Sequence, residues 1–274
     1  MHAIAFLGTG NMGGALARAA CRGTDPASVL LTNRTYSKAA ALAEELGCTA
    51  VHSNCEAVAQ ARILMLGVKP QMMASLLDEI KPVIKASLAR GEEKIVVSMA
   101  AGLPISFYLS ALDCPELPFL RIMPNTPAAV GQGMTLVSSC NATAEALDEI
   151  EALFHAAGRF DRISEAQMDA AGVVAGCTPA FACLFMEALA DGGVRAGLTR
   201  RQAQEYAAQA VLGTAALLLE SGKHPGVLKD EVCSPGGSTI AGVEMLEAGS
   251  FRYVAMEAVT AAVKRSMELG KPKE

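Results

Sequence analysis

Over its first 163 residues the chain alternates short apolar runs with longer stretches of helical spacing. The apolar runs are continuous, with no regular polar positions, which is typical of strands buried on both faces of a sheet. The pattern predicts strands at Ala3–Leu7, Val29–Thr32, Ile63–Leu66, Ile95–Ser98 and Phe119–Met123. It predicts helices at Met12–Arg22, Ser37–Leu46, Gln71–Arg90 and Ala144–Ala157. Strands that alternate with helices indicate an α/β fold with a doubly wound parallel sheet.

After Ser164 the strand pattern disappears and only helical spacing remains. Helices are predicted at Gln167–Val174, Pro179–Ala196, Arg200–Glu220, Thr239–Glu247 and Arg252–Glu268. We therefore expect two domains, residues 1–163 with the sheet and residues 164–274 entirely helical.

The helical part contains more apolar surface than a domain of its size needs for its own core. Ala170–Met186 has no charged residue, and Ala207–Leu219 has little polar surface. The first of these approaches the length of a membrane span, but Pro179 interrupts it and charged residues bound it, so we expect a helix buried in protein. Apolar surface of this extent predicts an interface, most simply a two-fold dimer.

Composition narrows the class of protein. The 274 residues include 23 Lys and Arg against 28 Asp and Glu, which gives a net charge of −5 and argues against a nucleic-acid surface. Eight cysteines and four histidines are dispersed, with no spacing typical of a metal site. Dispersed thiols behind an N-terminus without a leader pattern favour a cytoplasmic protein with no membrane partner.

A glycine-rich segment, Gly8-Thr9-Gly10-Asn11-Met12-Gly13, follows the first predicted strand and opens the first predicted helix. In GxGxxG spacing the first glycine makes a tight turn, the second admits a pyrophosphate, and the third lets helix pack on strand. Glycines also mark ordinary turns, but this context favours a Rossmann-type dinucleotide site that includes Gly8, Gly10, Asn11 and Met12.

The end of the second predicted strand bears on which dinucleotide binds. An NAD site usually ends this strand with a carboxylate that holds the ribose hydroxyls. Here the strand ends with Asn33, Arg34 and Thr35, and Lys38 lies one turn further on. A guanidinium attracts a 2′-phosphate, so we expect NADPH in preference to NADH. A solvated surface arginine is the alternative.

Three further loops follow predicted strands and should lie at the same edge of the sheet. They are Ser53-Asn54, Gly67-Val68-Lys69-Pro70 and Ser98-Met99-Ala100-Ala101-Gly102. Ligands of such sheets lie beyond the carboxyl ends of the strands. For Lys69, a solvated loop lysine is an equal alternative on spacing alone.

A second glycine pair lies between two predicted helices, in Ser234-Pro235-Gly236-Gly237-Ser238-Thr239. A prolyl and glycyl backbone cannot continue a helix. Two glycines before a helix N-terminus let N–H groups converge on an anion, and Ser238 and Thr239 add hydroxyls. A capped interhelix turn is the alternative.

At these residues the chain resembles a known family, the pyrroline-5-carboxylate reductases. The most specific likeness is the run Lys229–Gly242 around the Ser-Pro-Gly-Gly loop, continued by Leu246-Glu247 and Phe251-Arg252. Other segments match in order along nearly the whole chain: Gly8–Gly13, Val68-Lys69-Pro70, Arg121-Ile122-Met123-Pro124-Asn125-Thr126-Pro127 and Glu187-Ala188-Leu189-Ala190-Asp191.

The resemblance implies reduction of the C=N bond of 1-pyrroline-5-carboxylate to L-proline by NADPH or NADH, the last step of proline biosynthesis. It implies that Ser234, Gly236, Gly237 and Ser238 hold the substrate carboxylate and that Thr239 bonds the ring nitrogen. It implies that Asn54, Val68, Lys69, Pro70, Ala100 and Ala101 lie by the cofactor. It further implies a dimerisation domain, a homodimer and often a ring of dimers.

The chain departs from the family before the long helix. The family usually reads Ser-Gly-Ser-Gly-Pro-Ala-Tyr where this chain reads Ala175-Gly176-Cys177-Thr178-Pro179-Ala180-Phe181. A hydroxyl and a phenol are lost, which puts pocket size and substrate affinity in question. A non-catalytic NADP(H)-binding regulatory paralogue is therefore an alternative.

A related hydroxyacid-type dehydrogenase is the second alternative. Such enzymes place a catalytic lysine on the first long helix of the second domain. No Lys, Arg or His occurs between Arg162 and Arg195, which argues against that class. A cyclic imine can arrive already protonated, so its reduction mainly requires orientation of the two reactants.

Overall fold

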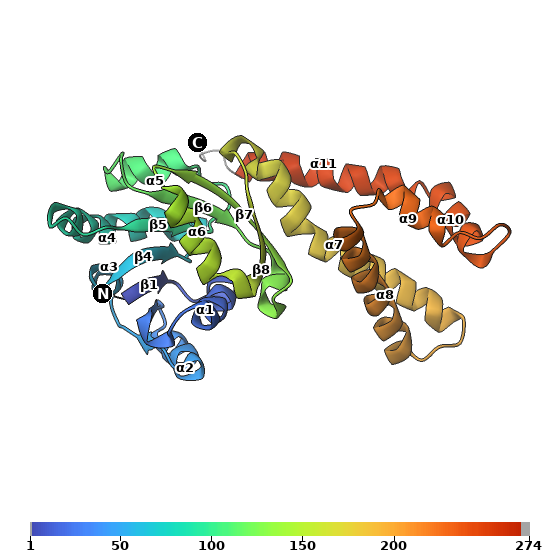
Figure 1. Ribbon diagram of the computed structural model, residues 1–274, viewed down its shortest axis with the longest axis horizontal. Helices are drawn as coiled ribbons and strands as arrows, with labels where there is room; N and C mark the ends of the chain where they lie inside the picture. Colours follow the sequence, from blue (N-terminus) through green and yellow to red (C-terminus); the bar gives the residue numbers. More distant parts are fainter. Residues whose placement is uncertain (1, 270–274) are drawn as a thin grey trace. The chain divides into compact units, whose positions relative to one another are not determined.

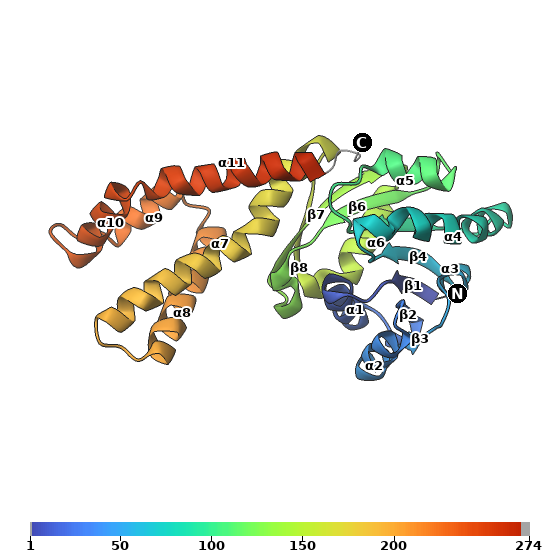
Figure 2. The ribbon, with the colours of Figure 1, turned by 180° about the vertical axis from the view of Figure 1, so that it is seen from behind.

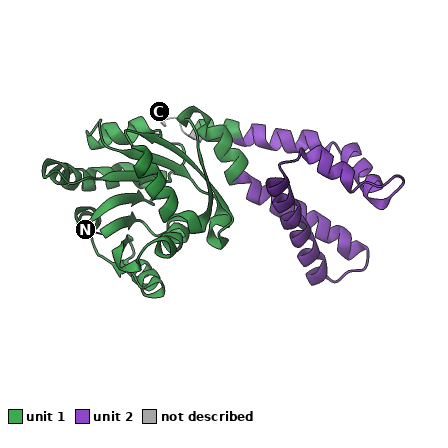
Figure 3. Cartoon of the chain, viewed as in Figure 1, with its two compact units in different colours: residues 1–176, 263–274 green, residues 177–262 purple. Residues whose placement is uncertain are grey.

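The computed structural model describes residues 2–269. Two compact units divide the chain: one holds residues up to 176 together with those from 263 onward, and the other holds residues 177–262 (Figure 3). The predicted boundary after residue 163 falls just behind the last strand, whereas the division between the compact units falls within the following long helix.

The first unit contains an eight-stranded sheet (Figure 1). Its strands are β1 His2–Leu7, β2 Val29–Thr32, β3 Thr49–Ala50, β4 Ala61–Leu66, β5 Ile95–Ser98, β6 Phe119–Met123, β7 Gly133–Cys140 and β8 Gly158–Arg162. They are ordered β3-β2-β1-β4-β5-β6-β7-β8. The five predicted strands are confirmed, and β3, β7 and β8 are additions.

The predicted doubly wound parallel sheet is confirmed, with one antiparallel pair among the described strands. β6 and β7 are antiparallel, with Phe119 opposite Cys140 and Met123 opposite Leu136. The connection between them is a short segment with a 3₁₀ turn at Thr126–Val130, and no crossover helix returns the chain to the other end of the sheet.

Helices cover both faces of the sheet because alternate residues of its central strands point to opposite sides (Figure 2). Phe6 packs in one core and Leu7 in the other. On the Phe6 side lie α1 Asn11–Gly23, α2 Tyr36–Leu46 and α6 Ala144–Leu153; on the Leu7 side lie α3 Asn54–Gln60, α4 Pro70–Ala89 and α5 Ile105–Leu112. The four predicted helices of this part are confirmed in α1, α2, α4 and α6.

The order of the strands determines where a ligand can bind. β1 lies between β2 and β4, so the chain leaves β1 to one side and later returns to its other side. Ligands of open α/β sheets bind at such a switch point, beyond the carboxyl ends of the strands. The segments that follow β1, β2 and β4 therefore surround the expected ligand-binding site.

The rest of the chain is helical: α7 Met168–Arg195, α8 Arg200–Ser221, α9 Pro225–Glu231, α10 Ser238–Ala248 and α11 Phe251–Leu269. Two helices were expected around Pro179, but α7 is continuous with this proline inside it. Pro179 has no N–H for the carbonyl of Ala175, four residues earlier. That carbonyl instead accepts a hydrogen bond from the side-chain amide of Asn125, at 3.0 Å, so the helix continues without an orphaned acceptor.

Candidate functional site: a dinucleotide groove and a glycine loop

The turn between β1 and α1 is closed by glycines. Gly8 has φ +108°, and a Cβ on Gly13 would lie 2.4 Å from the Gly8 carbonyl oxygen. Gly10 differs, because a Cβ there would have no protein atom within 4 Å. The structure therefore needs Gly8 and Gly13 for packing, whereas the open space at Gly10 suits the close approach of a ligand.

The N-terminus of α1 offers hydrogen-bond donors at the same place. Gly10 is the N-cap residue and provides no side-chain cap, so the first N–H groups of the helix are without an intrahelical partner. The hydroxyl of Thr9 is buried and has no hydrogen-bond partner. Backbone donors at a helix N-terminus, beside open space, are suited to a pyrophosphate.

A groove of about 560 Å³ lies between α1 and α2 and brings together Gly10, Asn11, Asn33, Arg34 and Thr35. Arg34 and Lys38 are exposed on its α2 side. Glu45 is the one carboxylate among the described residues that line it, and Arg18 binds Glu45 through two hydrogen bonds of 2.7 Å.

The Arg18 guanidinium lowers the pKa of Glu45, mainly through its hydrogen bonds. With that carboxylate occupied, Arg34 and Lys38 give the groove a positive end that suits a phosphate ester.

An adjoining groove of about 700 Å³ runs from the glycine turn to α4. Of the predicted cofactor residues it brings together Gly8, Gly10, Asn33, Arg34, Asn54, Val68 and Lys69. Its far wall is one face of α4, with residues at helical spacing: Gln71, Met72, Ser75, Leu76 and Glu79.

A chain of hydrogen bonds crosses this second groove. The Thr32 hydroxyl donates to Asn54 Oδ1 at 2.6 Å, and Asn54 Nδ2 donates to Glu79 Oε2 at 3.0 Å. Because an ionised carboxylate only accepts, these contacts fix which way the Asn54 amide points. Sequence reasoning missed Thr32 and Glu79. The helical spacing of Glu79 with Gln71 and Ser75 is the signal that could have indicated it.

Four other predicted cofactor residues do not line these grooves. Met12 lies in the first turn of α1, and Pro70 is the first residue of α4, directly after Lys69 as N-cap. Ala100 is buried, with its N–H donated to Ser98 Oγ at 3.3 Å, and Ala101 is exposed beside it. Ala100 and Ala101 follow β5, so they lie at the same edge of the sheet as the glycine turn.

The Ser234–Thr239 segment lies in the second unit and joins α9 to α10. Gly236 has φ +67°, which favours glycine, and Gly237 is the N-cap of α10 without a side-chain cap. Its turn is closed by a hydrogen bond from the Gly237 N–H to the Ser234 carbonyl at 3.0 Å. Ser238 and Thr239 are exposed in the first turn of α10. The loop therefore presents backbone donors and two hydroxyls together.

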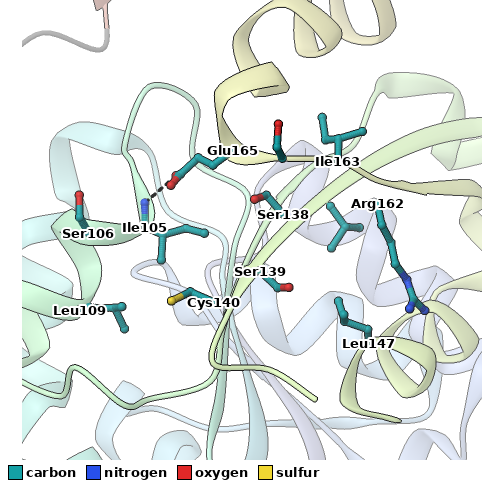
Figure 4. A pocket seen from close by; sticks show the side chains of 12 residues that line it. Ile105, Ser106, Leu109, Ser138, Ser139, Cys140, Leu147, Arg162, Ile163 and Glu165 are labelled. Atoms are coloured by element: carbon teal, nitrogen blue, oxygen red, sulfur yellow. Dashed lines mark hydrogen bonds between the residues drawn. The ribbon is translucent and has the colours of Figure 1, made fainter. Parts of the chain in front are cut away.

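Another cavity of the first unit, of about 460 Å³, lies beside β7 (Figure 4). Its charged groups already have partners: Glu165 accepts from the Ile105 N–H at 2.8 Å, and Arg162 pairs with Glu151 and Asp148. These contacts connect structural elements, so we assign no ligand here. Within residues 2–269 no group of three or more His, Cys, Asp and Glu side chains is arranged to hold a metal ion.

The long apolar helix is not buried within the single chain, contrary to expectation. Residues Glu165–Arg195 are long and apolar enough to cross a membrane by length and composition, and only 11% of their most apolar window is buried. Leu184 is 68% exposed, and Leu212 on α8 is 55% exposed. Among the residues that the structure describes, these apolar side chains remain largely uncovered.

The fold and the grooves define a dinucleotide-binding α/β protein with a helical C-terminal part. Comparison with known families agrees. A family model described as NADP oxidoreductase, coenzyme F420-dependent, matches residues 3–102, and one described as pyrroline-5-carboxylate reductase dimerisation matches residues 165–269.

Relatives and solved structures specify the family. The chain is 40% identical to the pyrroline-5-carboxylate reductase of Pisum sativum, over 98% of this chain and 96% of that protein. It is 37% identical to that of Escherichia coli, over 98% of both chains. A Plasmodium falciparum pyrroline carboxylate reductase with NADP bound superposes with a TM-score of 0.86 at 30% identity, over 98% of both chains. This chain belongs to the pyrroline-5-carboxylate reductase family.

Proposed function

We propose that this protein reduces the C=N bond of 1-pyrroline-5-carboxylate with NADPH to give L-proline, the last step of proline biosynthesis. The observation that carries the proposal is family membership over 98% of the chain together with the open Ser234–Thr239 loop. Most of the cofactor residues predicted from the sequence lie along two adjoining grooves.

The grooves assign parts of the cofactor to particular residues. Backbone N–H groups at the start of α1 would hold the pyrophosphate, and the open space at Gly10 admits it. Arg34 and Lys38 would hold the 2′-phosphate, and the Asn54 amide would hold the adjoining ribose. When bound, NADPH supplies the hydride. Lys69 lies along the same groove and adds a further positive charge near the dinucleotide.

The glycine loop would bind the substrate. The N–H groups of Gly236 and Ser238 would donate hydrogen bonds to the carboxylate, and Gly237, whose own N–H closes the turn on the Ser234 carbonyl, would frame the carboxylate pocket. Thr239 would hold the ring nitrogen. The long helix that follows the sheet has no Lys, Arg or His before Arg195, so it supplies no acid of that kind. An imine that arrives protonated has an electrophilic carbon already, and the protein then acts by orienting it.

The assembly follows from the exposed helices. We propose a homodimer in which α7 and α8 are covered by the helices of a second copy, and a ring of dimers remains an expectation from the resemblance. Leu184→Glu and Leu212→Glu should each convert the dimer to monomer in light scattering. Val130→Glu is the matched control, because Val130 is 75% exposed but lies on the sheet unit. A wild-type protein that is monomeric and active at micromolar concentration contradicts the dimer.

We further propose a cytoplasmic location, for which the eight free and dispersed cysteines are the support. Fractionation of cells that produce the protein tests it, with the protein expected in the soluble fraction. Recovery of the protein in membranes contradicts the proposed location.

One assay tests the activity itself. NADPH oxidation is measured with 1-pyrroline-5-carboxylate, and NADP⁺ reduction is measured with a panel of 3-hydroxyacids. We expect turnover only in the first arm. Turnover in the second arm indicates a hydroxyacid-type dehydrogenase. NADPH binding without turnover in either arm indicates a non-catalytic regulatory paralogue.

A further inference from the structure

Glu79 of α4 is the one carboxylate among the described residues that line the second groove, which runs from the glycine turn to α4. Its side chain is exposed, so a ligand in the groove can reach it. In the first groove the carboxylate of Glu45 is paired with Arg18, whereas no ion pair of the described residues includes Glu79. The negative charge of Glu79 is therefore available to a ligand.

Two contacts with the start of α3 hold Glu79 in place. Asn54 Nδ2 donates to Glu79 Oε2 at 3.0 Å, and Cys55 Sγ donates to the backbone carbonyl of Glu79 at 3.4 Å. Asn54 and Cys55 are the first two residues of α3. Asn54 is in turn bound to the end of β2, because the hydroxyl of Thr32 donates to Asn54 Oδ1 at 2.6 Å. A carboxylate from the helix that follows β4 is thus connected to the end of β2.

The end of β2 is where an NAD site usually places a carboxylate, which accepts hydrogen bonds from the ribose hydroxyls. In this chain β2 is followed by Asn33 and Arg34, and neither is acidic. Glu79 supplies a carboxylate from a different element at the same edge of the sheet. Arg34 lines the same groove, so the groove offers both a guanidinium and a carboxylate to one ribose.

The two side chains keep hydrogen-bonding capacity for a ligand. Asn54 retains one N–H of its amide, and Glu79 retains its second carboxylate oxygen, Oε1. A ribose hydroxyl can accept from the first and donate to the second. In NADH both the 2′- and the 3′-hydroxyl can donate to a carboxylate. In NADPH a phosphate replaces the 2′-hydroxyl, so one donor is lost and a like charge is brought near Glu79.

We propose that Glu79 is a specificity-determining residue of the cofactor site, which binds the ribose hydroxyls of NADH and limits the preference for NADPH that Arg34 creates. The inference rests on the proposed function, because it requires a dinucleotide in these grooves. Glu79 and Arg34 act in opposite directions on the choice of cofactor. Removal of the Glu79 charge raises selectivity for NADPH, and removal of the Arg34 charge lowers it.

Glu79→Gln tests this role, because it keeps an oxygen that accepts from Asn54 and removes only the charge. In calorimetry on the full-length protein, the Kd for NADH should rise about tenfold or more, while the Kd for NADPH should stay within about threefold of wild type. Asp78→Asn is the matched control, because Asp78 is the neighbouring exposed carboxylate of α4 and lines neither groove. It should leave both Kd values unchanged. Equal changes for NADH and NADPH in Glu79→Gln overturn the proposal.

A ligand analogue separates direct contact from a merely structural effect. 2′-Deoxy-NADH lacks one of the hydroxyls that Glu79 would accept from, so wild type should bind it about tenfold more weakly than NADH. Glu79→Gln should bind 2′-deoxy-NADH and NADH with Kd values within about twofold of each other, because the partner of that hydroxyl is already gone. If the variant loses affinity for both ligands by the same factor, Glu79 does not contact the ribose and the proposal is overturned.

These measurements need no turnover, so they can fail separately from the proposed function. A protein that shows the expected Kd shifts but does not reduce 1-pyrroline-5-carboxylate supports the role of Glu79 and contradicts the proposed function. A protein that turns over and shows no selective shift in Glu79→Gln supports the function and overturns the role of Glu79. Absence of binding for both NADPH and NADH overturns the two together.

Discussion

The side-chain amide of Asn125 donates a hydrogen bond to the carbonyl of Ala175 at 3.0 Å. This carbonyl is the one that Pro179 cannot serve, because proline has no N–H. The Asn125 amide oxygen meanwhile accepts from the Met134 N–H at 2.9 Å, so one buried side chain connects α7 to the start of β7. Asn125 of the Met-Pro-Asn-Thr-Pro run therefore supplies the hydrogen bond that Pro179 cannot make within the continuous helix α7.

A double-mutant cycle tests this relationship. Asn125→Ala should destabilise the fold by about 2–4 kcal/mol, since two buried backbone groups lose their partners. Pro179→Ala restores an N–H that can donate to the Ala175 carbonyl. In the Asn125→Ala background, Pro179→Ala should therefore stabilise more than it does in wild type. Urea denaturation of the four proteins measures the coupling, and strictly additive effects would show that the two residues act independently.

Substitution of two glycines of the nucleotide site should have different effects, one on stability and the other on NADPH binding. A Cβ on Gly67 would lie 2.3 Å from the Gly8 carbonyl oxygen, so Gly67→Ala should cost about 1–3 kcal/mol of stability. Gly10→Ala meets no protein atom and has an ordinary backbone conformation, so its Tm should stay close to that of wild type. Its Kd for NADPH should nonetheless rise at least about tenfold, because the methyl group occupies ligand space. Thermal unfolding and calorimetry separate the two effects, and unchanged NADPH binding by Gly10→Ala would place the pyrophosphate elsewhere.

Substitution of Arg34 should affect the use of NADPH much more than the use of NADH. Arg34→Ala should lower kcat/KM for NADPH by about 10–100-fold, the scale of one charge-assisted phosphate contact, and should change NADH much less. Arg22→Ala is the matched control, because Arg22 is an exposed arginine of α1 that does not line the grooves. Steady-state kinetics with both cofactors measure the ratio. Equal losses for NADPH and NADH would mean that Arg34 does not contact the 2′-phosphate.

A substitution in the glycine loop should lower kcat/KM for the substrate without changing the affinity for NADPH. Thr239→Ala should lower kcat/KM for 1-pyrroline-5-carboxylate by about 10–100-fold, because the ring nitrogen loses its partner. Its Kd for NADPH should remain near that of wild type. Thr214→Ala is the control, since the Thr214 hydroxyl only bonds back to the Ala210 carbonyl within α8. If Thr239→Ala keeps wild-type kinetics, the substrate is held elsewhere.

Gly237→Val should be more damaging than Thr239→Ala, for a reason that the structure adds. A Cβ on Gly237 would lie 2.4 Å from Ser234 Oγ, so a side chain disturbs the loop before it reaches any substrate. Circular dichroism should show an intact fold, because the loop is exposed and α10 contains no buried residue. Kinetics should show a loss greater than that of Thr239→Ala. Activity equal to that of wild type would contradict a binding role for the loop.

The sequence by itself determined the elements whose requirements are local. Continuous apolar runs indicated β1, β2, β4, β5 and β6, because a strand buried on both faces has no polar positions. The spacing Gly8–Gly13 indicated the nucleotide turn, because the positive φ of Gly8 and the close packing of Gly13 on the Gly8 carbonyl arise within one short segment. The sequence pattern did not predict β8, Gly158–Arg162, because this strand lies at the edge of the sheet and includes charged residues.

Only the tertiary structure decided the contacts between distant segments. Glu79 reaches Asn54 because α3 and α4 lie on the same face of the sheet, and Arg18 reaches Glu45 because α1 and α2 pack together. The continuity of α7 through Pro179 likewise depended on an amide from a remote loop. A local pattern records what one segment requires of its surroundings. Which distant side chain meets that requirement follows from how the helices pack on the sheet, and no short stretch of sequence contains that information.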